Sequence, residues 1–281
     1  MSVVDVRGLV RSYDRKYAID HLDLTVEAGQ CVAMLGPNGA GKTTTVEILE
    51  GYRRRDAGEV SVLGVDPANA DKRWRQRIGI VLQEAHDLGD ATVQEALRHF
   101  AHFYEHPRSA DEATDLVGLT EQANQRIGSL SGGQRRRLDV ALGVIGRPEL
   151  LFLDEPTTGF DPEARHVFWG LINRLKADGV TILLTTHYLE EADALADRVV
   201  VIAKGRKVAD TTPDELGGRD KDVVTVRWND AGLEQSEETD TPTRTVQRLI
   251  EHFGGEVPGL EIVRMTLEQA YLNLVNREEG P

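Results

Sequence analysis

The chain has 281 residues, which is enough to bury a core and to hold one large domain, alone or with a smaller one. Hydrophobic residues make up 40% and charged residues 28%, as in an ordinary globular protein. The formal net charge of −14 argues against a protein that binds nucleic acid through bulk electrostatics.

The first 30 residues have the pattern of half-buried antiparallel strands. Apolar residues recur at every second position, first at Val4 and Val6 and then across residues 22–26. Residues 14–16 and 27–29 are typical of turns. We therefore expect an antiparallel β subdomain at the start of the chain.

A phosphate-binding loop pattern, G-x-x-x-x-G-K-T, follows at residues 36–43. An apolar run that begins at Cys31, the only cysteine, precedes it and fits a buried parallel strand, and helix-forming sequence follows up to Gly51. Glycines let successive backbone N–H groups face phosphate oxygens. Lys42 is placed to reach the outer phosphates, and the Thr43 hydroxyl suits Mg²⁺. A glycine-rich turn with a solvated lysine is the alternative, and the flanking strand and helix disfavour it.

Strands and helices then alternate around a polar insertion. Short strands are predicted at 59–63 and 78–82, and helical periodicity without strand character predicts a helical insert at about 84–146. The later predicted elements are strands at 150–153, 181–184 and 199–202 and a helix at 162–178. Such alternation indicates parallel βαβ units.

The tail differs in composition from the rest of the chain. Residues 217–222 read as a linker, so we expect domains at 1–216 and 217–281. The tail should form a small α+β unit, with a strand, an acidic polar patch, a helix, a strand and a helix at 223–228, 234–243, 246–253, 260–265 and 267–275.

Two acids, Asp154 and Glu155, end the strand at 150–153. The carboxyl ends of parallel strands face the ligand crevice, so Asp154 is suited to hold Mg²⁺ and Glu155 to polarise an attacking water. Two solvated acids are the alternative, which the upstream phosphate loop disfavours.

A second anion-binding pattern, Ser131-Gly132-Gly133-Gln134, opens a helix. A small hydroxyl residue and two glycines at a helix start form a backbone nest for an anion. An ordinary serine cap explains Ser131 but not the whole pattern. The arginine runs at 53–55 and 135–137 are interpreted as solvated surface.

In the order and spacing of these motifs, residues 3–213 closely resemble the ATP-binding subunit of ATP-binding cassette (ABC) transporters. The resemblance implies an α/β P-loop NTPase fold with a RecA-like parallel-sheet core, an antiparallel β subdomain, a helical insert and a small α+β C-terminal unit. It also implies an active ATPase with ATP and Mg²⁺ as cofactors.

The resemblance implies roles for single residues. Glu155, His187, Gln83 and Lys42 are expected to act in catalysis, with Gln83 also contacting Mg²⁺ beside Thr43 and Asp154. Tyr13 falls where the family stacks an aromatic ring on adenine; Tyr17 is the weaker candidate, and core packing is the alternative for both. Further nucleotide contacts are expected from Gly36, Asn38, Gly39, Gly41, Lys42, Thr43 and Thr44, and from Ser131, Gly132, Gly133, Gln134 and Asp161. Asp161 also fits a helix N-cap before Pro162.

The partners follow from the same resemblance. In the family, the signature motif at 130–134 caps ATP held by the opposite subunit, which implies a head-to-tail homodimer around two ATP molecules. No apolar run approaches the roughly 20 residues of a spanning helix. A separate membrane permease is therefore expected to dock near Gln83 and the helical insert. Without a secretory signal, we expect a cytoplasmic chain, peripheral on the cytoplasmic face of the cell membrane.

The end of the chain indicates the kind of transporter. Residues 266–274 are similar to the C-terminal piece of ATPases that serve ABC-2-type exporters, such as the daunorubicin-resistance type. This predicts efflux of a drug or lipid-like cargo. One alternative is a soluble ABC ATPase acting on ribosomes or nucleic acid, which the single cassette and the acidic charge disfavour. A non-hydrolysing regulatory subunit is disfavoured by Glu155 and His187.

Overall fold

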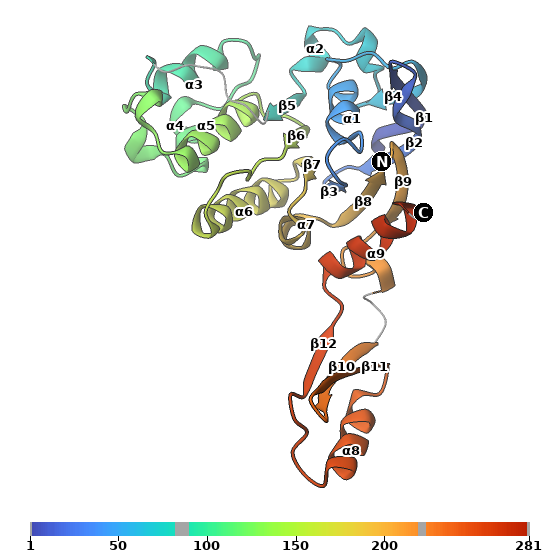
Figure 1. The fold of residues 1–281 in the computed structure, drawn as a ribbon. Helices are drawn as coiled ribbons and strands as arrows, with labels where there is room; N and C mark the ends of the chain where they lie inside the picture. Colours follow the sequence, from blue (N-terminus) through green and yellow to red (C-terminus); the bar gives the residue numbers. More distant parts are fainter. Residues whose placement is uncertain (1, 82–89, 219–222, 280–281) are drawn as a thin grey trace. The chain divides into compact units, whose positions relative to one another are not determined.

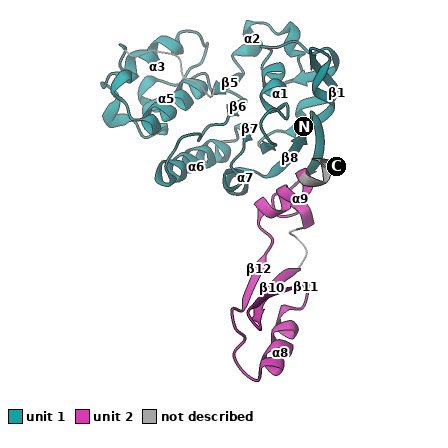
Figure 2. Ribbon diagram, viewed as in Figure 1, with its two compact units in different colours: residues 1–210 teal, residues 211–281 magenta. Residues whose placement is uncertain are grey.

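The structure, a computed structural model, describes residues 2–81, 90–218 and 223–279, with side chains up to residue 275 (Figure 1). The chain divides into two compact units, residues 1–210 and 211–281 (Figure 2). Each unit is described by itself below.

Unit 1 begins with the predicted antiparallel sheet. Its strand order is β2-β1-β4, from β1 (Ser2–Tyr13), β2 (Lys16–Glu27) and β4 (Ala57–Val62). Asp14 and Arg15 make the tight turn between β1 and β2 with positive φ angles of 48° and 67°. The apolar residues at alternate positions are buried, so this sheet confirms the period-two prediction.

The core of unit 1 is a six-stranded sheet. Its order is β5 (Ile78–Val81), β6 (Leu150–Asp154), β7 (Thr181–Thr186), β3 (Cys31–Leu35), β8 (Arg198–Ala203) and β9 (Arg206–Thr211). The pairs β5–β6, β6–β7, β7–β3 and β3–β8 are parallel. The carboxyl ends of β3, β6 and β7 therefore lie at one edge of the sheet, next to one another.

Helices cover both faces of this sheet. Figure 1 shows α1 (Lys42–Leu49) on one side and α6 (Pro162–Ala177) and α7 (Leu189–Leu195) on the other. Strands β3 and β6 are therefore buried along their whole length, including Cys31, as predicted. Val32, Phe152 and Val200 join one apolar cluster with residues of the antiparallel sheet. The short helix α2 (Lys72–Arg75) and the 3₁₀ turn η1 (Pro67–Asn69) lie between β4 and β5 in the chain.

The helical insert follows β5. It contains α3 (Val93–Ala101), α4 (Ala110–Leu116) and α5 (Gly132–Val144), with 3₁₀ turns η2 (Thr120–Gln122) and η3 (Ile127–Ser129). Figure 1 shows the three helices gathered beyond the β5 edge of the sheet. Each of them starts with a capping box, at Thr92, Ser109 and Ser131.

Unit 2 contains an antiparallel sheet of order β11-β10-β12, from β10 (Val224–Asp230), β11 (Leu233–Thr239) and β12 (Glu261–Arg264). Helix α8 (Pro242–Phe253) packs on it through Val224, Val226 and Leu249. Helix α9 (Leu267–Glu279) contacts the turn η4 (Leu216–Gly218). The sequence predicted no strand in the acidic patch, yet its first half is β11. Seven paired positions with β10 hold this mostly exposed edge strand in place.

Candidate functional site

The loop from Gly36 to Thr43 closes around the Lys42 side chain. Lys42 Nζ donates hydrogen bonds to the carbonyl oxygens of Gly36 (2.8 Å) and Pro37 (3.2 Å), and the side chain is buried. Burial lowers the pKa of Lys42, and the carboxylates of Glu155 and Asp154 oppose that shift. The ammonium group therefore lies within electrostatic reach of both acids.

Two glycines of this loop are required by close backbone contacts. A Cβ at Gly36 would lie 2.3 Å from the carbonyl oxygen of Ile202, and one at Gly41 would lie 2.3 Å from that of Ala18. Gly41 also has a φ of 105°, which other residues rarely adopt. Gly41 is the N-cap of α1 and provides no side-chain cap. The first N–H groups of α1 are thus left to bind an anion, unlike those of the three capped helices of the insert.

Thr185, at the end of β7, fixes both acids that follow β6. Its hydroxyl donates to Asp154 Oδ1, and Asp154 is buried. The backbone N–H of Glu155 donates to the carbonyl oxygen of Thr185 (3.0 Å) and to its hydroxyl oxygen (3.2 Å). Glu155 has a φ of 45°, a left-handed conformation that costs on the order of 1–3 kcal/mol and persists only where its surroundings hold it. No local sequence signal marked Thr185, because its role arises from strand pairing.

His187 lies against Glu155. Its Nδ1 is 3.2 Å from Glu155 Oε2, and the His187 side chain is 38% exposed whereas that of Glu155 is 15% exposed. Thr158 Oγ1 lies 3.4 Å from the same carboxylate oxygen. The structure thus brings Lys42, Asp154, Glu155 and His187 together at one edge of the core sheet.

The signature residues and Asp161 form a second group. A hollow of about 220 Å³ is lined by Ser131, Gly133, Gln134 and Asp161, among others. Ser131 caps α5 by accepting from the Gln134 N–H (3.2 Å), while Gln134 Oε1 accepts from the Ser131 N–H (2.9 Å). Asp161 caps α6 through the Ala164 N–H (2.8 Å), which confirms the N-cap prediction. In the described part of the chain, no hydrogen bond or ion pair joins this group to Lys42, Asp154, Glu155 or His187.

The interpretation of residues 135–137 as solvated surface is wrong for Arg136. This side chain is buried, and its guanidinium donates to the carbonyl oxygens of Pro156 (2.8 Å) and Asp154 (3.2 Å). Burial lowers the pKa of Arg136. Arg136 thereby connects α5 to the loop that carries the two acids.

Tyr13 is partly covered by two arginines. The guanidinium carbons of Arg11 and Arg53 lie 4.7 and 5.5 Å from the Tyr13 ring centre, and Tyr13 is 37% exposed. Tyr17 is 54% exposed. Gln83 lies outside the described residues.

The donors near the loop suit a hard cation that also binds phosphate. Mg²⁺ uses one or two protein carboxylates and completes its shell with phosphate and water. The buried carboxylate of Asp154 and the exposed hydroxyl of Thr43 provide such oxygens. Within the described ranges, no three or more His, Cys, Asp or Glu side chains are grouped so that they could hold a metal ion.

Known proteins resemble this chain in sequence and in fold. The family described as "ABC transporter" matches residues 19–158. The Nod factor export ATP-binding protein I of Burkholderia lata is 41% identical over 218 residues, covering 76% of this chain and 72% of that protein. The protein of the same name from Rhizobium meliloti is 42% identical over 218 residues, covering 76% of this chain and 65% of that protein.

The chain belongs to the ABC transporter family. It is the ATP-binding subunit of an ABC transporter and an ATPase. A structure described as an ATP-binding subunit of an ABC transporter has a TM-score of 0.71 at 23% identity, covering 97% of this chain and 99% of that one. A dimeric bacterial ABC transporter cassette has a TM-score of 0.67 at 23% identity, covering 74% and 98%. These similarities confirm the predicted fold, the α/β ABC ATPase cassette.

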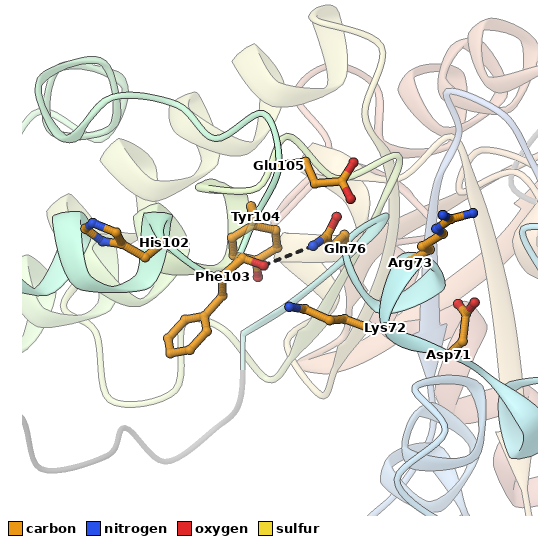
Figure 3. A pocket seen from close by; sticks show the side chains of 8 residues that line it. All are labelled: Asp71, Lys72, Arg73, Gln76, His102, Phe103, Tyr104 and Glu105. Carbon is orange, nitrogen blue, oxygen red and sulfur yellow. Dashed lines mark hydrogen bonds between the residues drawn. The ribbon is translucent and has the colours of Figure 1, made fainter.

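This ABC ATPase has a surface pocket of about 430 Å³ between α2 and the segment after α3. Figure 3 shows Lys72 extending from α2 toward the Phe103 segment, where Gln76 Nε2 donates to the Phe103 carbonyl oxygen (3.0 Å). Phe103 is 53% exposed and lies edge-on to His99 and Phe100. Among the described residues, no helix has both the length and the apolar character to cross a bilayer.

Proposed function

We propose that this ABC ATPase powers the export of a drug or lipid-like cargo through a separate membrane permease, at the cytoplasmic face of the membrane. The relatives named for Nod factor export support an export role. The similarity of residues 266–274 to ABC-2-type exporter ATPases supports it as well. Residues 1–216 would be the ATPase domain and residues 217–281 an accessory unit.

In this proposal, the loop at 36–44 binds the ATP phosphates. The uncapped N–H groups of α1 face the anion, and Lys42 exchanges its bonds to the Gly36 and Pro37 carbonyls for bonds to the outer phosphates. Tyr13, whose ring is contacted by Arg11 and Arg53, stacks on adenine. Thr43, Asp154 and Gln83 would hold Mg²⁺, which would neutralise phosphate charge.

The observation that carries the catalytic assignment is the 3.2 Å contact between His187 and Glu155, next to the buried Lys42. Glu155 orients a water molecule for attack on the γ-phosphate, and the adjacent His187 contacts that phosphate. Thr185 holds the Glu155 backbone so that its side chain stays beside His187. Positioning and charge neutralisation of this kind are the main requirements of phosphoryl transfer.

The signature group needs a second chain to act on ATP. Ser131, Gly132, Gly133 and Gln134 open α5 far along the chain from the loop, and they share a hollow with Asp161. We infer that two subunits pair head to tail, so that each signature group meets the ATP on the partner's loop. ATP binding then closes the dimer and hydrolysis releases it, a two-state change that a permease converts into transport.

The permease contact is proposed at the pocket between α2 and the Phe103 segment (Figure 3). This pocket combines charged side chains, among them Asp71 and Lys72, with the exposed ring of Phe103. It lies at the helical insert, where the family resemblance implies docking.

The variant Glu155→Gln tests the function. Removing the carboxylate should leave ATP binding within about twofold and lower turnover by at least about 100-fold, because the water loses its orienting base. A dimer should accumulate with ATP on size-exclusion chromatography. Glu190→Gln, the same change at an exposed position of α7, is the matched control. Unchanged turnover in Glu155→Gln would refute the catalytic assignment.

A further inference from the structure

Glu191 is a fully buried acid that the proposed mechanism does not use. It lies in the first turn of α7 and has no solvent exposure. Neither of its carboxylate oxygens makes a hydrogen bond of normal geometry within the described residues, and the same is true of Thr157 Oγ1 and Trp169 Nε1. Burial raises the pKa of Glu191, although the nearby Thr186, Thr157 and Trp169 groups oppose that shift. Three potential donors therefore lie near one carboxyl group, and none of them makes a hydrogen bond of normal geometry with it.

Each of these donors belongs to a segment that carries a residue of the proposed site. Thr157 is buried in the loop between Glu155 and Asp161. Thr186 directly precedes His187 and accepts from the Tyr188 N–H (3.0 Å), so its own hydroxyl hydrogen remains to be donated. Trp169 lies on α6, the helix that Asp161 caps.

Burying the Glu191 carboxyl, the Thr157 hydroxyl and the Trp169 N–H in this way is costly, because each has lost its water without gaining a hydrogen bond of normal geometry. A carboxylate only accepts hydrogen bonds, whereas two hydroxyls and an indole N–H can donate them. Hydrogen bonds from the Thr157 and Thr186 hydroxyls would satisfy the Glu191 carboxylate and the Thr157 hydroxyl together. The cluster thus favours an arrangement of the two segments other than the one seen here.

We propose that Glu191 is a positioning residue that ties the Glu155 loop to the His187 turn, by accepting hydrogen bonds from Thr157 and Thr186 in the hydrolysis-competent state. Arg165 on α6, whose charge lowers the pKa of Glu191, lies 3.3 Å from the exposed carboxylate of Glu190 and stacks on Tyr188. The network then transmits a change at one segment to the other. This role rests on the proposed functions of Glu155 and His187.

The test is ATP turnover by the full chain carrying Glu191→Gln. We expect kcat to fall at least about tenfold while the KM for ATP stays within about twofold, because Glu191 orders catalytic segments and does not touch ATP. Glu190→Gln removes the same charge one residue away, on the exposed face, and should change kcat by less than about twofold.

A second pair of variants protects the test against a folding defect. Thr157→Val removes one donor and should also lower kcat, and the double variant Thr157→Val/Glu191→Gln should lose little more than Glu191→Gln alone. Unchanged kcat in either single variant would overturn the proposal, as would losses that multiply in the double variant or a KM that rises together with the fall in kcat. Glu155→Gln separates the two claims: full turnover there refutes the proposed site, whereas the coupling between positions 157 and 191 is measured independently of it.

Discussion

Glu50 is a buried acid at the C-terminal end of α1, near enough to Asp154 for the two carboxyl groups to interact. The residue is buried, and burial raises its pKa from 4.5 to about 8, with Asp154 and Glu47 adding to the shift. The folded protein therefore holds a proton on Glu50 at pH values where the unfolded chain has released it. The contribution of Glu50 to the free energy of unfolding is therefore fully present below about pH 4.5. It is lost as the pH rises toward 8.

The variant Glu50→Gln should remove this dependence. The free energy of unfolding of the wild type should fall as the pH rises from about 5.5 to 8, by at most about 1.4 kcal/mol per pH unit from this residue. The variant should show a flatter profile, since its amide does not titrate. Urea unfolding at several pH values measures both. Glu59→Gln, at an exposed position of β4, is the control; parallel profiles for Glu50→Gln and the wild type would contradict the expectation.

Candidate site residues that a local pattern marks could be predicted from the sequence, and those placed by tertiary contacts could not. Lys42 belongs to a recognisable loop, and in the structure its charge interacts with those of Glu155 and Asp154. Thr185 and Glu191 lie in ordinary strand and helix sequence, and they matter only because β7 pairs with β6 and because α7 packs against α6. Their roles become visible only once the chain is folded.

At the scale of elements, the capped helices of the insert allow the helix-capping role of Ser131 to be separated from its proposed role in ATP turnover. Ser109 and Ser131 cap α4 and α5 with the same capping-box geometry. Only Ser131 also lines the hollow with Asp161. A serine that serves as a cap alone should behave like Ser109.

Replacing each serine with alanine tests this. Both Ser109→Ala and Ser131→Ala should lower the free energy of unfolding by about 1 kcal/mol, because each removes an N-cap. Only Ser131→Ala should also lower ATP turnover, since its hydroxyl is proposed to reach the partner's γ-phosphate. Chemical denaturation and a steady-state ATPase assay measure the two effects. Equal ATP turnover in the two variants would mean that Ser131 acts only as a helix cap.

Elements with strong periodicity were predicted well, and those held by pairing were not. The apolar runs of β3, β6 and β7 mark strands buried on both faces, and all three were predicted. Strand β11 has an almost wholly polar sequence, so no hydrophobic pattern marked it; its hydrogen bonds to β10 determine its conformation. The insert was predicted as helical, but its division into short helices depends on the capping residues that start each one.

At the scale of the whole molecule, each chain has two helix starts, of different kinds, that are proposed to contact a nucleotide. The N-terminus of α1 has no side-chain cap and follows the loop whose carbonyls bind the Lys42 ammonium, whereas that of α5 is capped by Ser131, which lines a hollow with Asp161. One nucleotide per chain needs only the first. A symmetric pair of chains would use both, since each chain would supply α1 to one nucleotide and α5 to the other.

Mixing two defective chains tests this arrangement. In a Glu155→Gln background, Lys42→Ala chains and Ser131→Arg chains should each trap no ATP alone. A mixed dimer, however, contains one site with an intact lysine and an intact partner serine. Random pairing makes about half of the dimers mixed, so an equal mixture should trap about a quarter of the ATP held by Glu155→Gln alone. Filter binding with labelled ATP measures the trapped nucleotide.

The two extreme outcomes of this mixing experiment are both informative. No trapped ATP in the mixture would mean that Lys42 and Ser131 must come from one chain, although in the described residues no hydrogen bond or ion pair joins their two groups. Trapping as strong as that of Glu155→Gln alone would mean that neither residue is needed at a given site. Only the intermediate value follows from a nucleotide held between α1 of one chain and α5 of the other, because that geometry alone makes each mixed dimer half competent.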